Sequence, residues 1–370
     1  MKTTKIISAC AVLVALASCS NDHELFQQSP TPSDSDVINI VAASSKPVTR
    51  AAGTEDLQNM QFATGEKINV YLEENVSGGG SATTTYDMLR YAVSSTPNDL
   101  GKLLELISTD PAQAAPHYPI NGNGINAYAF YPALGTSESA YDVTKDLRSF
   151  SVAENQSNIA DYRKSDLMFG TNDWDSSTGA SIPSFPGTKK PNPVKLYFKH
   201  LLSKIIVKLK PGPGVTADKL KGATVKLYNA YPKATINPSN TGISVNVDEN
   251  TTSPATGYTL TTNYASTENT LNTETYAGCA GIIIPQDIAT SEQTKFIEIT
   301  LSPTYGSAKY VYNIADSDTN TDDSKMTFAP GKQYTYTITL SAGNVVVVST
   351  QIKDWDNTNI DGDANLVDAQ

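Results

Sequence analysis

Cysteine is scarce in this sequence. Only three of the 370 residues are cysteine, at positions 10, 19 and 279. Cys10 would leave with an N-terminal signal and Cys19 would be lipidated, so Cys279 is the one thiol expected in the mature chain. An intramolecular disulfide is therefore excluded. Cys279 lies among small and apolar residues and is expected to be a small buried hydrophobe.

Positive charge and histidine are also scarce. The chain has 27 Lys and Arg against 38 Asp and Glu, and its formal net charge is -11. This balance argues against nucleic acid or an anionic membrane surface as a partner. The three histidines, at positions 23, 117 and 200, are far apart in sequence, and the chain contains neither HExxH nor GxSxG. We therefore expect no zinc site, no hydrolytic site, no cofactor and no enzymatic activity.

One acidic stretch does resemble the first half of a calcium-binding loop. Oxygen-bearing side chains alternate there, at Asp316, Asp318, Asn320 and Asp322. A calcium loop of this type also needs glycine at its sixth position and glutamate at its twelfth, and both are missing. A solvated acidic hairpin loop is the preferred interpretation, and a calcium site is the weaker alternative.

Long apolar runs are absent too. The longest one near the N-terminus, residues 6–16, is too short to cross a bilayer and follows two lysines. It ends in Leu16-Ala17-Ser18-Cys19, which has the form of a lipobox. Residues 1–19 are therefore predicted to be a lipoprotein signal peptide, and acyl chains on Cys19 would be the only attachment to a membrane. An ordinary secreted protein with a chance cysteine at the cut is the alternative.

Residues 20–50 have two parts. A polar tether comes first, and a β-branched stretch at 36–43 then predicts a strand, with Val37, Ile38, Ile40 and Val41 as its apolar residues. Arg50-Ala51 follows among small residues, a composition typical of loops that proteases cut.

The remainder is rich in short alternating segments. Thr, Ser, Asn, Tyr and Gly are plentiful, charged residues make up 18% of the chain, and no heptad pattern occurs. The strongest strand signal, at 194–210, shifts its apolar phase near residues 201–203. Many short strands separated by polar turns favour β-sandwiches. The length and the Ser/Gly/Pro-rich stretch at 176–193 predict an N-terminal domain at 51–194 and a C-terminal domain at 195–370.

Five motifs in the right order resemble the fimbrillin family, the pilin subunits of type V pili in Gram-negative gut and oral bacteria. The first has the family's "F..GD.I.VY" form, although Asn69 stands where the family often has glycine. The motifs lie at residues 62–71, 165–169, 196–205, 328–340 and 351–355.

The resemblance implies two transthyretin-like Greek-key β-sandwich domains in tandem and an adhesive structural subunit of fimbriae. It implies an outer-membrane lipoprotein that an Arg-specific surface protease processes, after which it joins the fimbrium. The lipidated residue maps to Cys19, the cut to Arg50-Ala51, and the removed strand to Val37, Ile38, Ile40 and Val41. In this family the groove left by that strand accepts a strand of the next subunit, head to tail.

Three questions stay open at the level of sequence. The segment with Val345, Val346, Val347, Val348 and Ile352 is one candidate for the donor strand, but it could instead complete the second sandwich. The polar tail after Trp355 is the other candidate, and a tip or accessory pilin would donate no strand. A second class of function is a surface-anchored lipoprotein that binds glycan or protein without polymerising, through the loops at 171–193 and 228–240.

Overall fold

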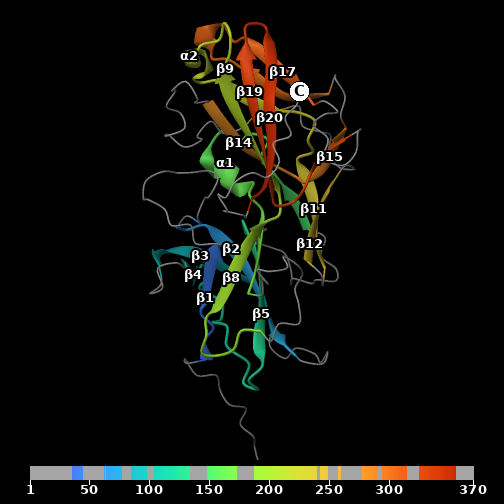
Figure 1. Ribbon diagram of the computed structural model, residues 1–370. Coiled ribbons are helices and arrows are strands. Elements are labelled where there is room, and N and C mark those ends of the chain that lie inside the picture. The colour runs from blue at the N-terminus through green and yellow to red at the C-terminus, as the bar shows by residue number, and fades with distance from the viewer. Residues whose placement is uncertain are drawn as a thin grey trace, which may run out of the picture.

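The protein is almost entirely β-structure, as the sequence predicts. The computed structural model describes residues 36–44, 62, 64–76, 85–97, 104–133, 148–172, 187–239, 242–248, 257–259, 277–289, 294–314 and 325–355. Within these residues the helical elements are α1 (Ile159–Lys164), α2 (Ala217–Leu220) and the 3-10 turn η2 (Pro303–Tyr305). Figure 1 shows two β-structures stacked end to end.

Seven strands of the first half form a closed ring in the order β1-β4-β3-β2-β5-β7-β8. They are β1 (Ile40–Ser44), β2 (Lys67–Asn75), β3 (Thr85–Pro97), β4 (Leu104–Ser108), β5 (Gly124–Tyr131), β7 (Met168–Thr171) and β8 (Val194–His200). β1 closes the ring, because it pairs antiparallel with β4 and parallel with β8.

The second half contains several sheets that enclose one core. Two four-stranded sheets have the orders β14-β9-β19-β20 and β13-β10-β16-β17, and two smaller sheets have the orders β12-β11-β6 and β15-β18. Their strands are β6 (Arg148–Ser151), β9 (Ser203–Pro211), β10 (Thr224–Leu227), β11 (Lys233–Ser239), β12 (Gly242–Val247), β13 (Tyr258–Thr259), β14 (Ala277–Ile283), β15 (Gln286–Ala289), β16 (Lys295–Thr300), β17 (Lys309–Asn313), β18 (Lys325–Phe328), β19 (Lys332–Ser341) and β20 (Asn344–Asp354). The all-β sandwich class is thus confirmed.

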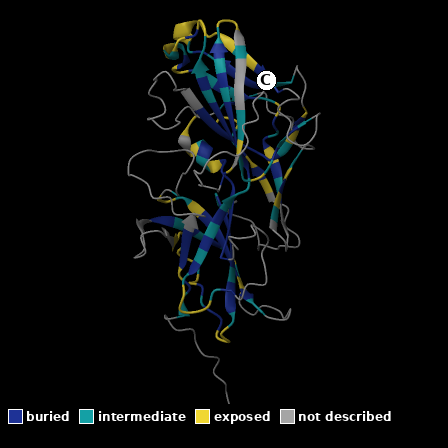
Figure 2. Ribbon diagram, viewed as in Figure 1, coloured by how far each residue is buried: buried dark blue, intermediate teal, exposed yellow. Residues whose placement is uncertain are grey.

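Period-two alternation determines which core each side chain of the first half enters. On β2, Ile68, Val70 and Leu72 belong to the core of the ring. Tyr71 on the opposite face belongs to the large core that continues through the second half. Because β2 has apolar contacts on both faces, most of its residues are buried, as the dark blue strands of Figure 2 illustrate.

The two halves are joined by more than one connection. β6 precedes β7 in the chain but pairs with β11 of the second half. The buried Gln156 side chain receives the Ile282 N–H at 2.8 Å and donates to the Ile282 carbonyl at 2.7 Å, as a neighbouring strand would. β8 lies in the ring along its whole length, so the chain passes into the second half shortly after the boundary predicted at residue 194.

Candidate functional site

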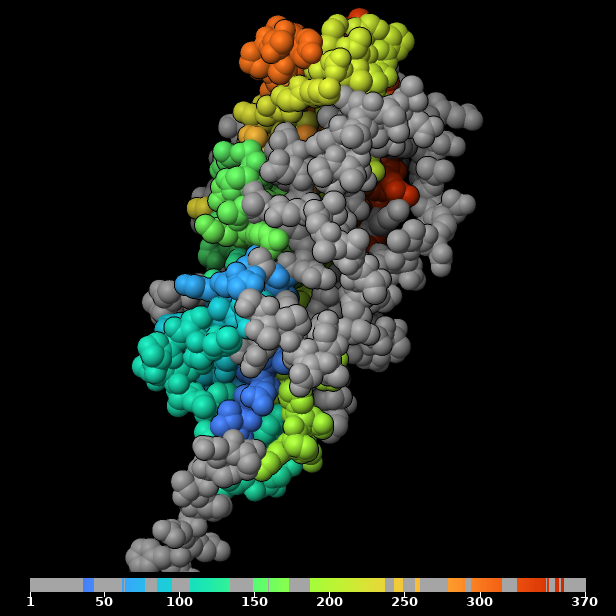
Figure 3. Space-filling view, turned by 90° about the vertical axis from the view of Figure 1, so that its left-hand side faces the viewer, coloured from blue at the N-terminus to red at the C-terminus, as the bar shows by residue number. Residues whose placement is uncertain are grey.

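The strand predicted to be removable is the strand that closes the ring. β1 has five registered pairs with β8, from Ile40 opposite Val194 to Ser44 opposite Phe198, and two pairs with β4. Figure 3 shows the blue segment at 36–44 on the surface, between the teal segment at 104–133 and the yellow-green segment that contains β8. The strand therefore has a hydrogen-bonded neighbour on each side and is still visible on the surface.

The apolar side chains of this segment alternate between two faces. Ile38 and Ile40 are each 3% exposed and lie in the core of the ring together with Ala42. Val41 is also buried, but it packs against Tyr197 on the other face. Val37 forms an isolated antiparallel bridge with His117. The predicted strand residues thus occupy one continuous site, in which side chains two positions apart fill the core.

Backbone contacts extend this site beyond the strand itself. The Ile38 N–H donates to the Pro116 carbonyl and the Tyr118 N–H donates to the Asp36 carbonyl, both at 2.8 Å. On the other side, the Val194 N–H donates to the Asn39 carbonyl at 2.9 Å. The segment at 36–44 is thus bound between two walls. One wall consists of residues 104–118, and the other consists of residues 190–200.

Sequence reasoning missed several residues of this site. Lys190 forms an ion pair with Asp36, and the Tyr118 hydroxyl donates to the Asn192 carbonyl. Burial raises the pKa of Tyr118 to about 12, so its hydroxyl stays protonated as a donor near neutral pH. The available signal was the sequence Pro-His-Tyr-Pro at 116–119, because its two prolines restrict the backbone on both sides of the aromatic residue.

The candidate donor residues lie on β20. Among the described strands of its sheet, β20 pairs with β19 alone, so it forms an edge. Val345 packs against the core of the second half, and Ile352 is 37% exposed. The backbones of Val346, Val347 and Val348 belong to the same strand.

β20 is anchored at its C-terminal end by Trp355. The Trp355 N–H donates to the Gly331 carbonyl at 2.8 Å, and the indole is 7% exposed. His200, at the end of β8, stacks on the Trp355 ring with centroids 3.8 Å apart. The same imidazole lies 2.7 Å from an Asp166 carboxylate oxygen. The end of β20 is therefore fixed where the two halves meet.

The remaining sequence predictions fall into two groups. Cys19, Arg50, Ala51 and the acidic stretch from Asp316 to Asp322 lie outside the described residues. Cys279 is buried as predicted, and burial raises the pKa of its thiol to about 12. In the part of the chain that the structure describes, no cluster of three metal-ligating side chains occurs. The described helices include none with the length and apolar character needed to cross a membrane.

These features define an all-β protein of two stacked parts, the first of which is closed by its own N-terminal strand. The model of the fimbrillin-like family matches residues 49–355, which is most of the sequence, and the chain belongs to this family. The motif resemblance is thereby confirmed. No curated protein is significantly similar to the chain in sequence.

Two solved structures share the fold. A candidate cell adhesion protein from Bacteroides uniformis ATCC 8492 is 20% identical, with a TM-score of 0.55 over 88% of this chain and 100% of that one. A candidate cell adhesion protein from Bacteroides ovatus ATCC 8483 is 17% identical, with a TM-score of 0.56 over 86% of this chain and 97% of that one.

Proposed function

We propose that this protein is a structural subunit of adhesive surface fimbriae that polymerises by strand exchange. It is exported as an outer-membrane lipoprotein on Cys19 and cut between Arg50 and Ala51 by an Arg-specific surface protease. The observation that carries the proposal is the position of β1, which closes the ring between β4 and β8. The family match begins at residue 49, next to the proposed cut, and leaves β1 out.

The physics of strand pairing supports a role for β1 as a removable plug. While it is present, it covers two strand edges and completes the core of the ring. Without it, unpaired amide and carbonyl groups would face an open apolar groove, an arrangement that readily pairs with another chain. A strand from the next subunit would supply both the backbone hydrogen bonds and the alternating side chains. Because such a contact is head to tail, it propagates as a filament.

Arg50 is the arginine best suited to the cut. The sequence contains four arginines. The other three lie in secondary structure, at Arg90 on β3, Arg148 on β6 and Arg163 on α1. Proteases cut extended, accessible segments and leave paired strands intact. Cleavage at Arg50 separates the plug from the rest of the chain without breaking a described strand.

We propose β20 as the donor strand. It is an edge strand, it carries Val345 to Val348 and Ile352, and it can leave its sheet by breaking one ladder, the one with β19. Alternating side chains of such a strand would fill the positions of Ile38, Ile40 and Ala42 in the ring of the next subunit.

The test replaces Arg50 in the lipoprotein expressed on cells. We expect Arg50→Ala to abolish the SDS-resistant ladders that the parent forms, because the plug stays in place. Lys46→Ala is the matched control, since it removes a nearby basic residue and leaves Arg50 intact. The N-terminus of the surface form gives a second readout, with Ala51 expected for the parent and Cys19 for Arg50→Ala. Ladders of normal length from Arg50→Ala would refute the proposal.

A further inference from the structure

The two walls of the β1 site differ in how they are held. The wall at 190–200 contains β8, which has four registered pairs with β7 and leads directly into the second half. The wall at 104–118 contains β4, which has five residues and an irregular register with β3 between Val93 and Pro97. If β1 leaves, β4 becomes an edge strand with one neighbour, so the second wall needs other support to keep its position.

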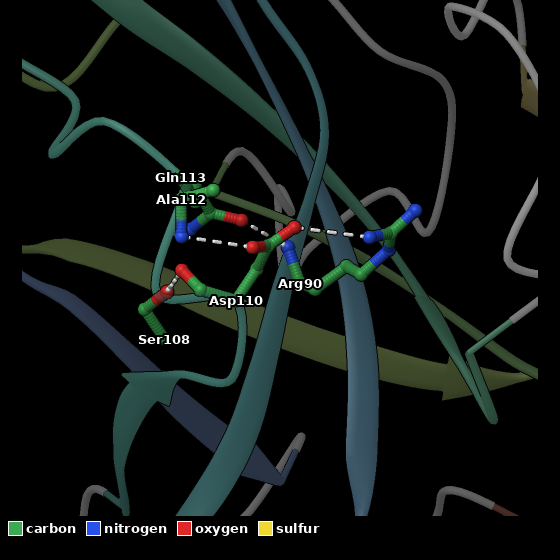
Figure 4. A network of polar contacts seen from close by, with 5 residues as sticks. All are labelled: Arg90, Ser108, Asp110, Ala112 and Gln113. Carbon is green, nitrogen blue, oxygen red and sulfur yellow. Dashed lines mark hydrogen bonds and ion pairs between the residues drawn. The ribbon is translucent and has the colours of Figure 1, made fainter.

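A polar network supplies this support just after β4 ends. The Asp110 carboxylate pairs with Arg90 of β3 through its Oδ2 atom at 3.0 Å, and its Oδ1 atom accepts the Ala112 N–H at 3.0 Å. The Gln113 side-chain oxygen accepts the Arg90 N–H at 2.7 Å, and the Ser108 hydroxyl donates to the Asp110 carbonyl at 3.2 Å. Figure 4 shows these residues converging on Asp110 beside β3. The turn that follows β4 is therefore tied to β3 by both side-chain and backbone atoms.

A second set of contacts holds the far end of the same wall. The Tyr86 hydroxyl of β3 accepts the His117 N–H at 2.9 Å. The Tyr118 hydroxyl donates to the Asn192 carbonyl, which belongs to the opposite wall. This last contact crosses the site itself. Neither contact includes an atom of the segment at 36–44, so both can persist when that segment is gone.

We propose that Asp110 and Tyr118 are positioning residues that keep the groove formed after β1 has left. The inference rests on the proposed function, since it assumes that β1 is exchanged for another strand. Asp110, with Arg90 and Gln113, fixes the turn after β4, and Tyr118 fixes the distance between the walls. A groove that keeps its shape spares the incoming strand the entropic cost of ordering it, and this raises affinity and rate of capture.

The experiment compares the parent chain with Asp110→Asn and Tyr118→Phe, each before and after the maturation cut and removal of the released strand. Hydrogen–deuterium exchange at residues 104–108 reports on the wall, and a synthetic peptide of residues 36–44 reports on the groove. In the uncut chains we expect exchange within about twofold of the parent, because β1 covers the wall. In the cut chains we expect about tenfold faster exchange and about tenfold weaker peptide binding.

Asp218→Asn is the matched control, since it makes the same chemical change on the remote helix α2, where Asp218 forms an exposed ion pair with Lys221. It should leave both readouts unchanged. A further set of uncut chains carries Ile40→Asp, which displaces β1 without a protease because a carboxylate cannot stay in the apolar core of the ring. If Ile40→Asp unfolds the protein, Ile40→Ala replaces it as a milder loss of β1 contacts.

These backgrounds separate two failures. If the protease cut does not release β1, the proposed maturation is wrong, and the Ile40 backgrounds still test Asp110 and Tyr118. The inference is overturned if Asp110→Asn and Tyr118→Phe match the parent in exchange and peptide binding in every background in which β1 has been removed, displaced or weakened. It is also overturned if they accelerate exchange equally with β1 in place, since that result marks a general structural role.

Discussion

Glu298 on β16 shows how this acidic protein keeps a charged residue nearly buried. Its carboxylate is 2.5 Å from the Lys295 ammonium and 3.6 Å from the Lys309 ammonium, and it accepts the Tyr228 hydroxyl at 3.3 Å. The Lys295 ammonium also lies 3.6 Å from the centre of the Tyr228 ring. The hydrogen bond from Lys295 lowers the pKa of Glu298 below its ordinary value of 4.5, although burial opposes the shift.

This lowered pKa predicts how Glu298 contributes to stability as pH changes. A carboxyl whose pKa is lower in the folded state stabilises the protein above the unfolded pKa, and that contribution is lost as pH falls through the folded pKa. We expect Glu298→Gln to lower the free energy of unfolding at pH 7 by about 1–3 kcal/mol, with a difference that shrinks below about pH 4.5. Urea unfolding at several pH values measures this. Asp218→Asn should show no such effect, and a constant difference down to pH 3 would contradict the prediction.

At the residue scale, the sequence predicts which side chains of a strand face a core, because alternation controls this. The apolar positions Ile38 and Ile40 could be assigned to a core because a strand places every second side chain on one face. The ion pair between Asp36 and Lys190 could not be predicted, because it joins residues 154 positions apart. The same holds for Tyr118 and Asn192, whose contact depends on the closure of the ring and on no local pattern.

At the element scale, many of the strands were predictable and their neighbours were not. The segment at 228–240 was expected to be a binding loop, and this was wrong, because it contains strand β11 (Lys233–Ser239), which pairs with β12 and β6. The phase shift near residues 201–203 correctly separates β8 from β9. The parallel pairing of β1 with β8 joins segments about 150 residues apart, and hydrophobic patterns carry no information on such partners. The pairing of β6 with β11 was missed for the same reason. In addition, the sequence that precedes residues 148–151 is polar and gave no strand signal.

The anchored end of β20 leads to a prediction about its release. If β20 is the donor, Trp355 must leave its position against His200 before the strand can move. We expect Trp355→Ala to lower the free energy of unfolding by about 3–5 kcal/mol and to make the cut protein form ladders faster. Trp355→Phe keeps an aromatic ring and should lie between the two. Ladder formation by SDS gels over time measures the rate.

The outcome for Trp355→Ala also decides between donors. An unchanged or slower rate of ladder formation, in a protein that remains folded by circular dichroism, would show that β20 stays in its sheet. The donor would then be sought in the residues after Trp355.

At the scale of the whole molecule, the larger of two apolar cores contains residues from both stacked halves. The ring has its own apolar cluster, which contains Ile40, Val70 and Leu196. Tyr71, Tyr128, Phe130 and Phe169 also come from strands of the ring, yet they belong to the cluster of the second half. Length and composition predict a two-part division, but they do not predict this shared core, because it requires strands buried on both faces.

A shared core predicts cooperative unfolding. We expect differential scanning calorimetry of the uncut protein to show one transition whose calorimetric and van't Hoff enthalpies agree.

Phe130 is fully buried and lies 5.3 Å from Phe169, ring centre to ring centre, so Phe130→Ala should remove about 3–5 kcal/mol of contact at the junction. The loss should split the transition in two. Leu340→Ala, at a buried site of β19, should lower the midpoint without splitting it. Two resolved transitions in the parent would mean that the halves unfold independently, and the aromatic contacts at the junction would then contribute little to the stability of either half.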